Sequence, residues 1–517
     1  MNLAHHLLRA AKANSSAPAL LKGLTPVADY GSLAASVASL AASLRQRLGL
    51  AKGDRVALLM KNVPDYVACL YACWHAGLVA VPINAKLHPR EVAFILDNSG
   101  AALVFVTEDM ANVASEALAL GTAKPRIIEI GSAEHRGLGK ADAIAIADVA
   151  ITDPAWIFYT SGTTGRPKGA VLSHRNLLAM SLNYLAEVNP IVPGEALLHA
   201  APMSHGSGLY MVPHVLGMGA QIIPESGRFE PDEILELTER RDGISFFAAP
   251  TMVRRLTVAA EAAGATAPGL KTIIYGGGPM YVADCKAALD AFGPKLVQIY
   301  GQGETPMTIT YLPRSMHVEV GHPRYEERLA SVGIAQGVVQ VRTVDETGRD
   351  VAADQIGEIV VRGDTVMSGY WQNPDATANT LRDGWLYTGD MGTFDADGFL
   401  TLKDRSKDVI ISGGTNIYPR EVEEVLLRHE SVAEVSVIGR PHPEWGEEVV
   451  AVVVPAADRA VTRNELDQVC HAWIARYKRP KHYYLMTELP KNSYGKIVKT
   501  ELRALLGASS TRLSPMD

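Results

Sequence analysis

The chain has 517 residues, which is enough for roughly three or four units of about 150 residues each. Apolar residues make up 47% and charged residues 20% of the sequence, and this composition excludes a disordered chain. Lys and Arg number 49 against 56 Asp and Glu, a net charge of −7. This acidic balance argues against a dedicated nucleic-acid-binding protein, which usually carries a basic surface.

Short β-rich runs alternate with amphipathic helices along the N-terminal part of the chain, after a first amphipathic helix at the N-terminus. The expected helices cover residues 34–48, 64–76 and 89–98. The expected strands cover residues 56–60, 79–83, 102–106, 156–159, 221–223, 245–248, 272–275 and 296–299. This alternation predicts an α/β fold of layered sheets with mostly parallel strands.

The pattern changes after Val332, where short strands (338–344 and 358–362) are separated by turn signals and helical patterns are scarce. We therefore expect a small β-rich subdomain over residues 332–403. From Lys403 helix and strand mix again, with helices at 419–428 and 462–476 and strands at 432–438 and 449–454. We expect an N-terminal domain (1–403), a hinge (404–408) and a small mobile α+β C-terminal domain (409–517).

The four cysteines, Cys69, Cys73, Cys285 and Cys470, form no Cys-x-x-Cys pair, which disfavours a zinc site or a disulfide framework. We expect buried, reduced thiols. The N-terminus lacks the apolar run of a signal peptide, and no uncharged stretch is long enough to span a membrane. We therefore expect a cytoplasmic protein with no membrane span.

The segment 159–169 reads Tyr-Thr-Ser-Gly-Thr-Thr-Gly-Arg-Pro-Lys-Gly and lies between an expected strand and a helix that starts near His174. Its glycines allow close approach to an anion, and its hydroxyls and lysine provide donors and charge, so it predicts a polyphosphate cradle rather than a solvated loop. A Walker loop is excluded because Pro167 stands where that motif needs its second glycine. The expected phosphate-binding residues are Thr160, Ser161, Gly162, Thr163, Thr164, Gly165 and Lys168.

This loop resembles the phosphate-binding signature of the adenylate-forming enzymes, which include acyl- and aryl-CoA synthetases, peptide-synthetase adenylation domains and firefly-type luciferases. Further segments match in the family's order over almost the whole chain. In the segment 299–306, the resemblance implies that Glu304 binds magnesium and that Tyr300 packs near adenine. A carboxylate beside phosphates suits Mg²⁺, which prefers oxygen ligands. The nucleotide-site residues implied here are Tyr300, Gly301, Gln302, Gly303, Glu304 and Thr305.

One position departs from the family pattern. The family usually carries a threonine before the magnesium-binding glutamate, where its hydroxyl meets the α-phosphate, and this sequence has Gly303. We hypothesise that the hydroxyl of Thr305 compensates for the missing one.

The resemblance implies roles for later segments. Asp390 would accept hydrogen bonds from both ribose hydroxyls, because an ionised carboxylate offers only acceptors. Arg405 would contact ribose or phosphate, and Lys407 would be the pivot of a hinge that serves two active conformations. Lys496 would reach the substrate carboxylate and the α-phosphate together and lower their electrostatic repulsion. The other implied residues are Gly276, Gly277, Gly278 and Pro279 at the adenine, Gly413 and Gly414 at the CoA tunnel, and Thr164 as a further catalytic group.

The segment 202–208 resembles the wall of the family's acyl pocket and places His205 beside the carboxylate substrate, as a catalytic residue. A buried structural histidine is the alternative reading. The expected pocket residues carry no cation that would pair a second carboxylate, which disfavours a dicarboxylate and favours an aromatic or medium-chain fatty acid. These residues are His205, Ser207, Tyr210, Gly276, Gly303 and Met307.

The resemblance implies an AMP-forming acid–CoA ligase that uses ATP, Mg²⁺ and CoA. Three alternatives remain open: a ligase that loads a separate carrier protein, a luciferase-like oxidative enzyme, and a non-catalytic nucleotide-binding relative. The expected partners are the carboxylic acid, ATP and CoA, with no nucleic acid. A homodimer is left open, and the resemblance implies that Lys496 is a target for a lysine acetyltransferase.

Overall fold

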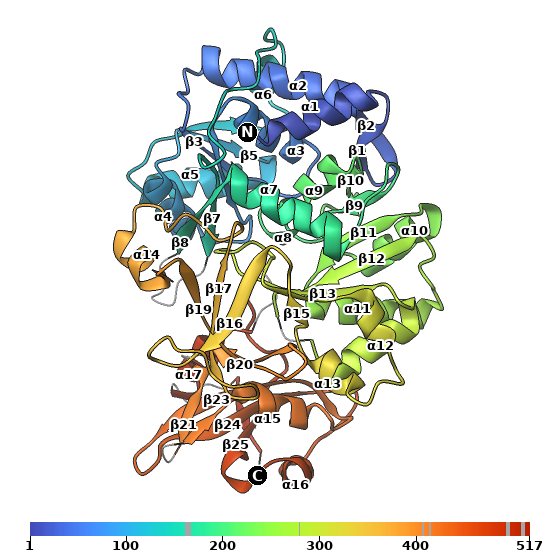
Figure 1. The fold of residues 1–517 in the computed structure, drawn as a ribbon, viewed down its shortest axis with the longest axis vertical. Helices are drawn as coiled ribbons and strands as arrows, with labels where there is room; N and C mark the ends of the chain where they lie inside the picture. The colour runs from blue at the N-terminus through green and yellow to red at the C-terminus, as the bar shows by residue number, and fades with distance from the viewer. Residues whose placement is uncertain are drawn as a thin grey trace. The chain divides into compact units, whose positions relative to one another are not determined.

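The computed structural model describes residues 1–160, 167–278, 280–405, 408–412, 415–492, 497–507 and 512–516. The chain divides into two compact units. Figure 1 labels most of their helices and strands. The first unit comprises Met1–Val341 and Val361–Leu386, and the second comprises Arg342–Val360 and Tyr387–Asp517. The hinge expected at 404–408 stays a prediction.

A six-stranded sheet forms one half of the first unit. Its strand order is β6-β5-β3-β4-β7-β8, and all neighbours are parallel except β7 and β8. The buried side chains of β3, β4 and β5 form one core cluster with those of α4 and α5. The strands are β3 (Arg55–Leu59), β4 (Val79–Ile83), β5 (Leu103–Val106), β6 (Arg126–Glu129), β7 (Pro154–Thr160) and β8 (Lys168–Ser173).

A nine-stranded sheet forms the other half, in the order β15-β14-β13-β12-β11-β9-β10-β1-β2. Its central strands are parallel, and antiparallel pairs lie at both edges. This confirms the expected α/β class with mostly parallel sheets. The strands are β1 (Pro18–Lys22), β2 (Thr25–Asp29), β9 (Ala196–Leu198), β10 (Ala220–Ile223), β11 (Ile244–Ala248), β12 (Leu270–Tyr275), β13 (Leu296–Tyr300), β14 (Thr310–Leu312) and β15 (Ile334–Ala335).

Local sequence signals explain where several helices begin and end. A capping box of Asp29 and Ser32 starts α2, and His88 with Glu91 caps α4, which ends at Gly100 in the left-handed region. The helix expected over 34–48 is α2 followed by a π-helical turn, η1. The first-unit helices are α1 (Ala4–Ala13), α2 (Tyr30–Ala42), η1 (Ser43–Arg47), α3 (Asp65–His75), α4 (Pro89–Ser99), η2 (Glu108–Met110), α5 (Ala111–Leu120), α6 (Ala133–Leu138), α7 (His174–Asn183), η3 (Tyr184–Val188), α8 (Gly206–Leu209), α9 (Met211–Leu216), α10 (Pro231–Arg240), α11 (Pro250–Ala263), α12 (Val282–Phe292), η4 (Arg314–Val318), α13 (Tyr325–Ala330) and α14 (Pro374–Thr380).

The β-rich region expected after Val332 is a five-stranded sheet of order β16-β17-β19-β18, with β20 paired to β19, and the division between the units runs through its strands. A further six-stranded sheet lies in the second unit, in the order β22-β21-β24-β25-β26 with β23 paired to β24. The strands are β16 (Val339–Val344), β17 (Gly357–Gly363), β18 (Leu381–Arg382), β19 (Trp385–Phe394), β20 (Leu400–Arg405), β21 (Ile410–Ser412), β22 (Thr415–Ile417), β23 (Val432–His442), β24 (Gly446–Pro455), β25 (His482–Leu485) and β26 (Ser514–Pro515).

The second unit has a core of its own. Val422 and Leu426 on α15 are buried against alternate valines of β23 and β24, as the helical spacing of that segment predicted. The helices of this unit are α15 (Pro419–Leu426), α16 (Arg463–Trp473), η6 (Arg476–Lys478) and α17 (Lys499–Gly507).

Two further expectations concern the whole sequence. All four cysteines are buried and unpaired, as predicted. Among the described residues, no helix combines the length and apolarity that a membrane-spanning segment requires.

Candidate active site

The predicted phosphate loop connects two antiparallel strands. Strand β7 ends at Thr160 and β8 begins at Lys168, and these two residues are register partners. A strand therefore lies between the loop and α7, which starts at His174 as expected. Thr160 and Lys168 fix the two ends of the loop side by side. The other predicted loop residues, Ser161, Gly162, Thr163, Thr164 and Gly165, lie outside the described residues.

Glu304 lies next to the start of this loop. The hydroxyl of Thr160 donates a hydrogen bond to Glu304 Oε1 at 3.3 Å. Tyr300, at the end of β13, is buried, and Glu304 follows it in a turn in which Gln302 bridges to Pro306. The two sheets of the first unit thus bring together the loop and the carboxylate that the family resemblance pairs.

A segment that the sequence did not predict joins both parts of the site. The backbone N–H of Met367 donates to the Glu304 carbonyl at 2.7 Å, and that of Trp371 donates to the Gly169 carbonyl at 2.7 Å. Between them, the Tyr370 hydroxyl donates to Glu304 Oε1 at 2.8 Å. The Lys168 ammonium lies 5.1 Å from the centre of the Tyr370 ring. No local pattern around residue 370 signals this role, because its partners are far away in the sequence.

Gly303 has no room for a side chain. A Cβ at this position would lie 2.5 Å from Thr160 Cγ2 and 2.7 Å from Phe158 Cδ1. Both neighbours belong to β7, so the strand before the phosphate loop packs directly on the backbone at residue 303. A threonine at this position would therefore collide with β7 in this chain.

The hypothesis that Thr305 compensates for Gly303 is wrong for this geometry. Thr305 is fully buried, and its hydroxyl is engaged with the Thr308 carbonyl at 2.9 Å and with the Thr365 hydroxyl at 2.9 Å. A side chain committed to these partners does not present its hydroxyl to a phosphate. The hydroxyls that contact the Glu304 carboxylate belong to Thr160 and Tyr370.

We expect the substitution Gly303→Ala to destabilise the protein by about 1–3 kcal/mol, because the new methyl group overpacks the contact with β7. A lower urea midpoint of unfolding would report this cost. The second substitution Thr160→Ser removes the methyl group that a Cβ meets first. Part of the lost stability should therefore return in the double variant, and strictly additive losses would contradict the packing explanation.

The glycines after β12 allow two strands to approach closely and the backbone to turn. A Cβ at Gly276 would lie 2.4 Å from the Ile299 carbonyl, so this glycine allows β12 to approach β13. Gly277 adopts a positive φ of 80°, which glycine tolerates best, and is exposed beside Gly278. Pro279 lies outside the described residues. The proposed adenine contact at Gly276, Gly277 and Gly278 stays a prediction.

His205 contacts the strand that leads into the phosphate loop. Its ring makes an edge-to-face contact with Phe158 at 4.9 Å between centroids, and its Nδ1 shares a hydrogen bond of 2.9 Å with the Ser204 hydroxyl. Burial lowers the pKa of His205 to about 3, so the ring is neutral at physiological pH. A neutral ring can wall a pocket or hydrogen bond a carboxylate, but it does not supply a positive charge.

Two of the other predicted pocket residues, Ser207 and Tyr210, are more deeply buried than His205. Ser207 is fully buried and shares a hydrogen bond of 2.8 Å with His199, so its hydroxyl faces the protein interior rather than an open pocket. Tyr210 is buried against Tyr184, with 4.4 Å between ring centroids. Met307 is half-buried and packs in the same apolar cluster. Of these three predicted pocket residues, Met307 is the one with substantial exposure.

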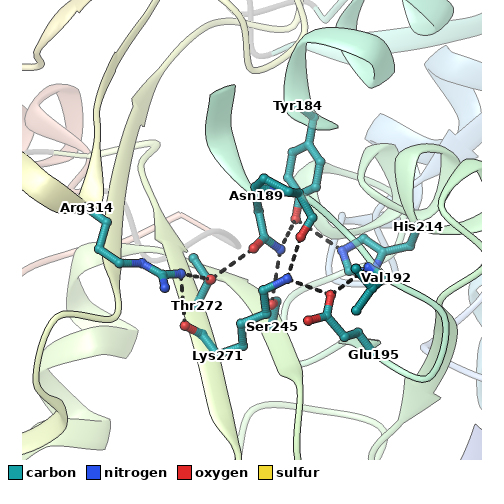
Figure 2. A network of polar contacts seen from close by, with 10 residues as sticks. Tyr184, Asn189, Val192, Glu195, His214, Ser245, Lys271, Thr272 and Arg314 are labelled. Atoms are coloured by element: carbon teal, nitrogen blue, oxygen red, sulfur yellow. Dashed lines mark hydrogen bonds and ion pairs between the residues drawn. The ribbon is translucent and has the colours of Figure 1, made fainter. Parts of the chain in front are cut away.

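A polar network fixes the strands next to this cluster, as Figure 2 shows. The Asn189 amide donates to the hydroxyls of Tyr184 and Ser245, each at 3.1 Å, and Thr272 donates to Asn189 Oδ1 at 3.0 Å. The Tyr184 hydroxyl also shares a hydrogen bond of 3.1 Å with His214. These bonds connect β11 and β12 to η3, which carries Tyr184 of the aromatic cluster. The network therefore holds Tyr184 in position.

The predicted nucleotide residues Asp390 and Arg405 lie in the second unit. They are register partners on the antiparallel strands β19 and β20. The Asp390 backbone N–H donates to the Thr388 hydroxyl at 3.1 Å. Lys407, Gly413, Gly414 and Lys496 lie outside the described residues, so their roles stay predictions.

The donor set at Glu304 suits Mg²⁺. The groups at this place are the Glu304 carboxylate and the hydroxyls of Thr160 and Tyr370, all of them oxygen groups. The described residues contain no cluster of three or more His, Cys, Asp or Glu side chains that would hold a metal ion by themselves. Mg²⁺ is usually held by one or two carboxylates together with substrate phosphates. Glu304 beside the phosphate loop matches that pattern.

Comparison with known proteins agrees with these features. The AMP-binding enzyme family model matches residues 7–371, and the model of the AMP-binding enzyme C-terminal domain matches residues 421–496. Feruloyl-CoA synthase from Amycolatopsis sp is 38% identical over 502 residues, which cover 97% of this chain and 98% of the relative. Fatty acid–[acyl-carrier-protein] ligase ScoC from Streptomyces coeruleorubidus is 33% identical, covering 90% of this chain and 89% of the relative.

A solved structure shares the fold. ATP-bound MatB from Rhodopseudomonas palustris aligns with a TM-score of 0.87 at 29% identity, covering 98% of this chain and all of MatB. The family models together with these relatives span almost the entire sequence. The chain therefore belongs to the AMP-binding enzyme family, within the adenylate-forming superfamily that its sequence motifs resemble.

Proposed function

We propose that this protein is an AMP-forming acid–CoA ligase. The observation that carries the proposal is the arrangement of Glu304 within 3.3 Å of Thr160 at the start of the phosphate loop, with Lys168 at its end. A magnesium-binding carboxylate beside a phosphate-binding loop is what activation of a carboxylic acid by ATP requires. The high identity to a relative named feruloyl-CoA synthase supports the same reaction.

The reaction has two steps. A carboxylate oxygen of the acid attacks the α-phosphorus of ATP, and the bond to pyrophosphate breaks to give an acyl-adenylate. The thiol of CoA then attacks the acyl carbon, loses its proton and displaces AMP. Mg²⁺ bound by Glu304 would neutralise phosphate charge in the first step. Lys168 would hold phosphate oxygens, and Lys496 would lie between the two reacting anions.

The acid is proposed to be aromatic or a medium-chain fatty acid. Phe158 packs against the His205 ring, and Met307 packs in an apolar cluster with Phe247 and Tyr210. The relative named feruloyl-CoA synthase supports an aromatic acid as the substrate. ScoC, whose name refers to fatty acids, supports a fatty acid. The predicted pocket residues themselves include no Lys or Arg that would pair a second carboxylate.

A carrier protein in place of CoA is the second candidate, because ScoC is named as a ligase for an acyl-carrier protein. We favour CoA, because the relative named feruloyl-CoA synthase is 38% identical to this chain and ScoC is 33% identical. The hinge at residues 404–408 would allow the C-terminal domain to serve both half-reactions. A cytoplasmic location, a homodimer and acetylation of Lys496 stay predictions.

The function is tested by a screen for pyrophosphate release with ATP, Mg²⁺ and a panel of aromatic, medium-chain and long-chain acids. We expect release with aromatic or medium-chain acids, and thioester formation when CoA is added. Thioester formation with a holo-carrier protein but not with CoA would favour the second candidate. No pyrophosphate release with any acid would contradict the ligase assignment.

A further inference from the structure

Tyr370 contacts both predicted phosphate-site groups, although no motif used above includes it. We propose that Tyr370 is a positioning residue that orients the Glu304 carboxylate for Mg²⁺ and keeps it apart from Lys168. The proposal rests on the proposed function, because it takes Glu304 as the magnesium ligand. It concerns the side chain behind that ligand, which neither the sequence motifs nor the relatives' names specify.

The first step of the argument is the asymmetry of the Glu304 carboxylate. Oε1 accepts hydrogen bonds from the hydroxyls of Tyr370 at 2.8 Å and Thr160 at 3.3 Å. For Oε2, no hydrogen bond is found within the described ranges. The shorter bond to an ionised acceptor is the stronger of the two, so Tyr370 sets the rotation of the carboxylate. Under this proposal, Oε2 is the oxygen that a cation would take.

The second step is that Tyr370 itself is held firmly. Its backbone N–H donates to the Thr377 hydroxyl at 2.8 Å, and that hydroxyl donates to the Asn373 carbonyl at 2.8 Å. The Asn373 side chain caps α14. The neighbouring N–H of Trp371 donates to Gly169 on β8. The backbone around Tyr370 is therefore bonded to both a helix cap and a strand. These bonds fix the position from which the Tyr370 side chain extends toward Glu304.

The third step concerns Lys168. Its ammonium lies over the Tyr370 ring at 5.1 Å from the centroid, while the hydroxyl of the same ring contacts Glu304. No ion pair between Lys168 and Glu304 exists in the part of the chain that the structure describes. The ring therefore stabilises the Lys168 ammonium through a cation–π contact. This contact replaces a direct ion pair between Lys168 and Glu304. Glu304 stays available to a metal ion and Lys168 to phosphate.

The test compares Tyr370→Phe with Tyr325→Phe as a matched control. Tyr325 also donates a hydrogen bond from its hydroxyl, to the His317 carbonyl at 2.8 Å, and also has a lysine over its ring, Lys286 at 6.0 Å. Both substitutions remove one hydroxyl and keep the ring. Calorimetry would measure binding of a non-hydrolysable ATP analogue with Mg²⁺ and with EDTA.

We expect Tyr370→Phe to reduce the gain in affinity that Mg²⁺ gives by about 10-fold, the usual effect of removing a group that orients a metal ligand. Affinity in EDTA should stay unchanged, and Tyr325→Phe should match the wild type in both conditions. Equal weakening with Mg²⁺ and with EDTA, or no change in either, would overturn the proposal.

A double-variant cycle gives an independent check. In a Glu304→Gln background, adding Tyr370→Phe should cause no further loss of the Mg²⁺-dependent gain, because the oriented carboxylate is already absent. Additive losses would refute the positioning role. If the wild type itself gains no affinity from Mg²⁺, the assignment of Glu304 in the proposed function fails. If the wild type gains affinity and Tyr370→Phe retains that gain, the positioning role alone fails.

Discussion

Lys496→Ala is expected to slow adenylation by about 10²- to 10³-fold while leaving thioester formation from preformed acyl-adenylate close to the wild-type rate. The lysine would stabilise two anions as they approach each other, and that encounter occurs only in the first half-reaction. Once the adenylate exists, CoA attacks a neutral acyl carbon, so the ammonium of Lys496 is no longer required.

The two half-reactions can be measured separately, by pyrophosphate release and by AMP release from synthetic acyl-adenylate with CoA. Lys491→Ala is a suitable control, because it removes a lysine of the same segment, whose ammonium forms a partly buried ion pair with Glu434 at 2.7 Å. Equal losses in both half-reactions would argue against the proposed role of Lys496.

Glu304→Gln is expected to lower the adenylation rate by about 100-fold or more, equivalent to about 3 kcal/mol of transition-state stabilisation. The substitution removes the negative charge that would hold Mg²⁺ and keeps the size of the side chain. The amide oxygen can still accept the hydrogen bonds from Tyr370 and Thr160. The loss should therefore appear in catalysis and in the Mg²⁺ dependence, with an unchanged melting temperature.

Glu187→Gln provides the comparison for this experiment. The Glu187 carboxylate also accepts hydrogen bonds, from the Gly337 backbone N–H at 3.1 Å, and belongs to no proposed site. Its variant should keep wild-type adenylation and Mg²⁺ dependence. A Glu304→Gln enzyme with a normal rate and normal Mg²⁺ dependence would show that the metal is held elsewhere.

Much of the fold could be predicted because its signals are local. The apolar runs at 56–60 and 79–83 correspond to β3 and β4, and Pro89 marks the start of α4. Strand β8 was not predicted, because its first residues belong to a glycine-rich motif that resembles a loop. The π-helical turn after α2 was also missed, since no residue in Ser43–Arg47 breaks the helical pattern.

The site was predictable to the extent that a residue's type decides its role. Glu304 and Thr160 were both identified from motifs, and their side chains meet. Side-chain direction was not predictable. Thr305 follows Glu304 directly, yet its hydroxyl turns into the core toward Thr365. Tyr370 was missed because its bond to Glu304 spans 66 positions in the sequence, and only the folded chain brings the two together.

The buried cysteines have a practical consequence. Burial raises the pKa of all four thiols, so in the native protein they are neither accessible nor ionised. Alkylating reagents will consequently label them at the rate at which the surrounding core opens. Cys69, Cys73 and Cys285 belong to the first unit and Cys470 to the second. Peptide mass spectrometry after timed labelling can therefore follow the unfolding of each unit separately in one unmodified sample.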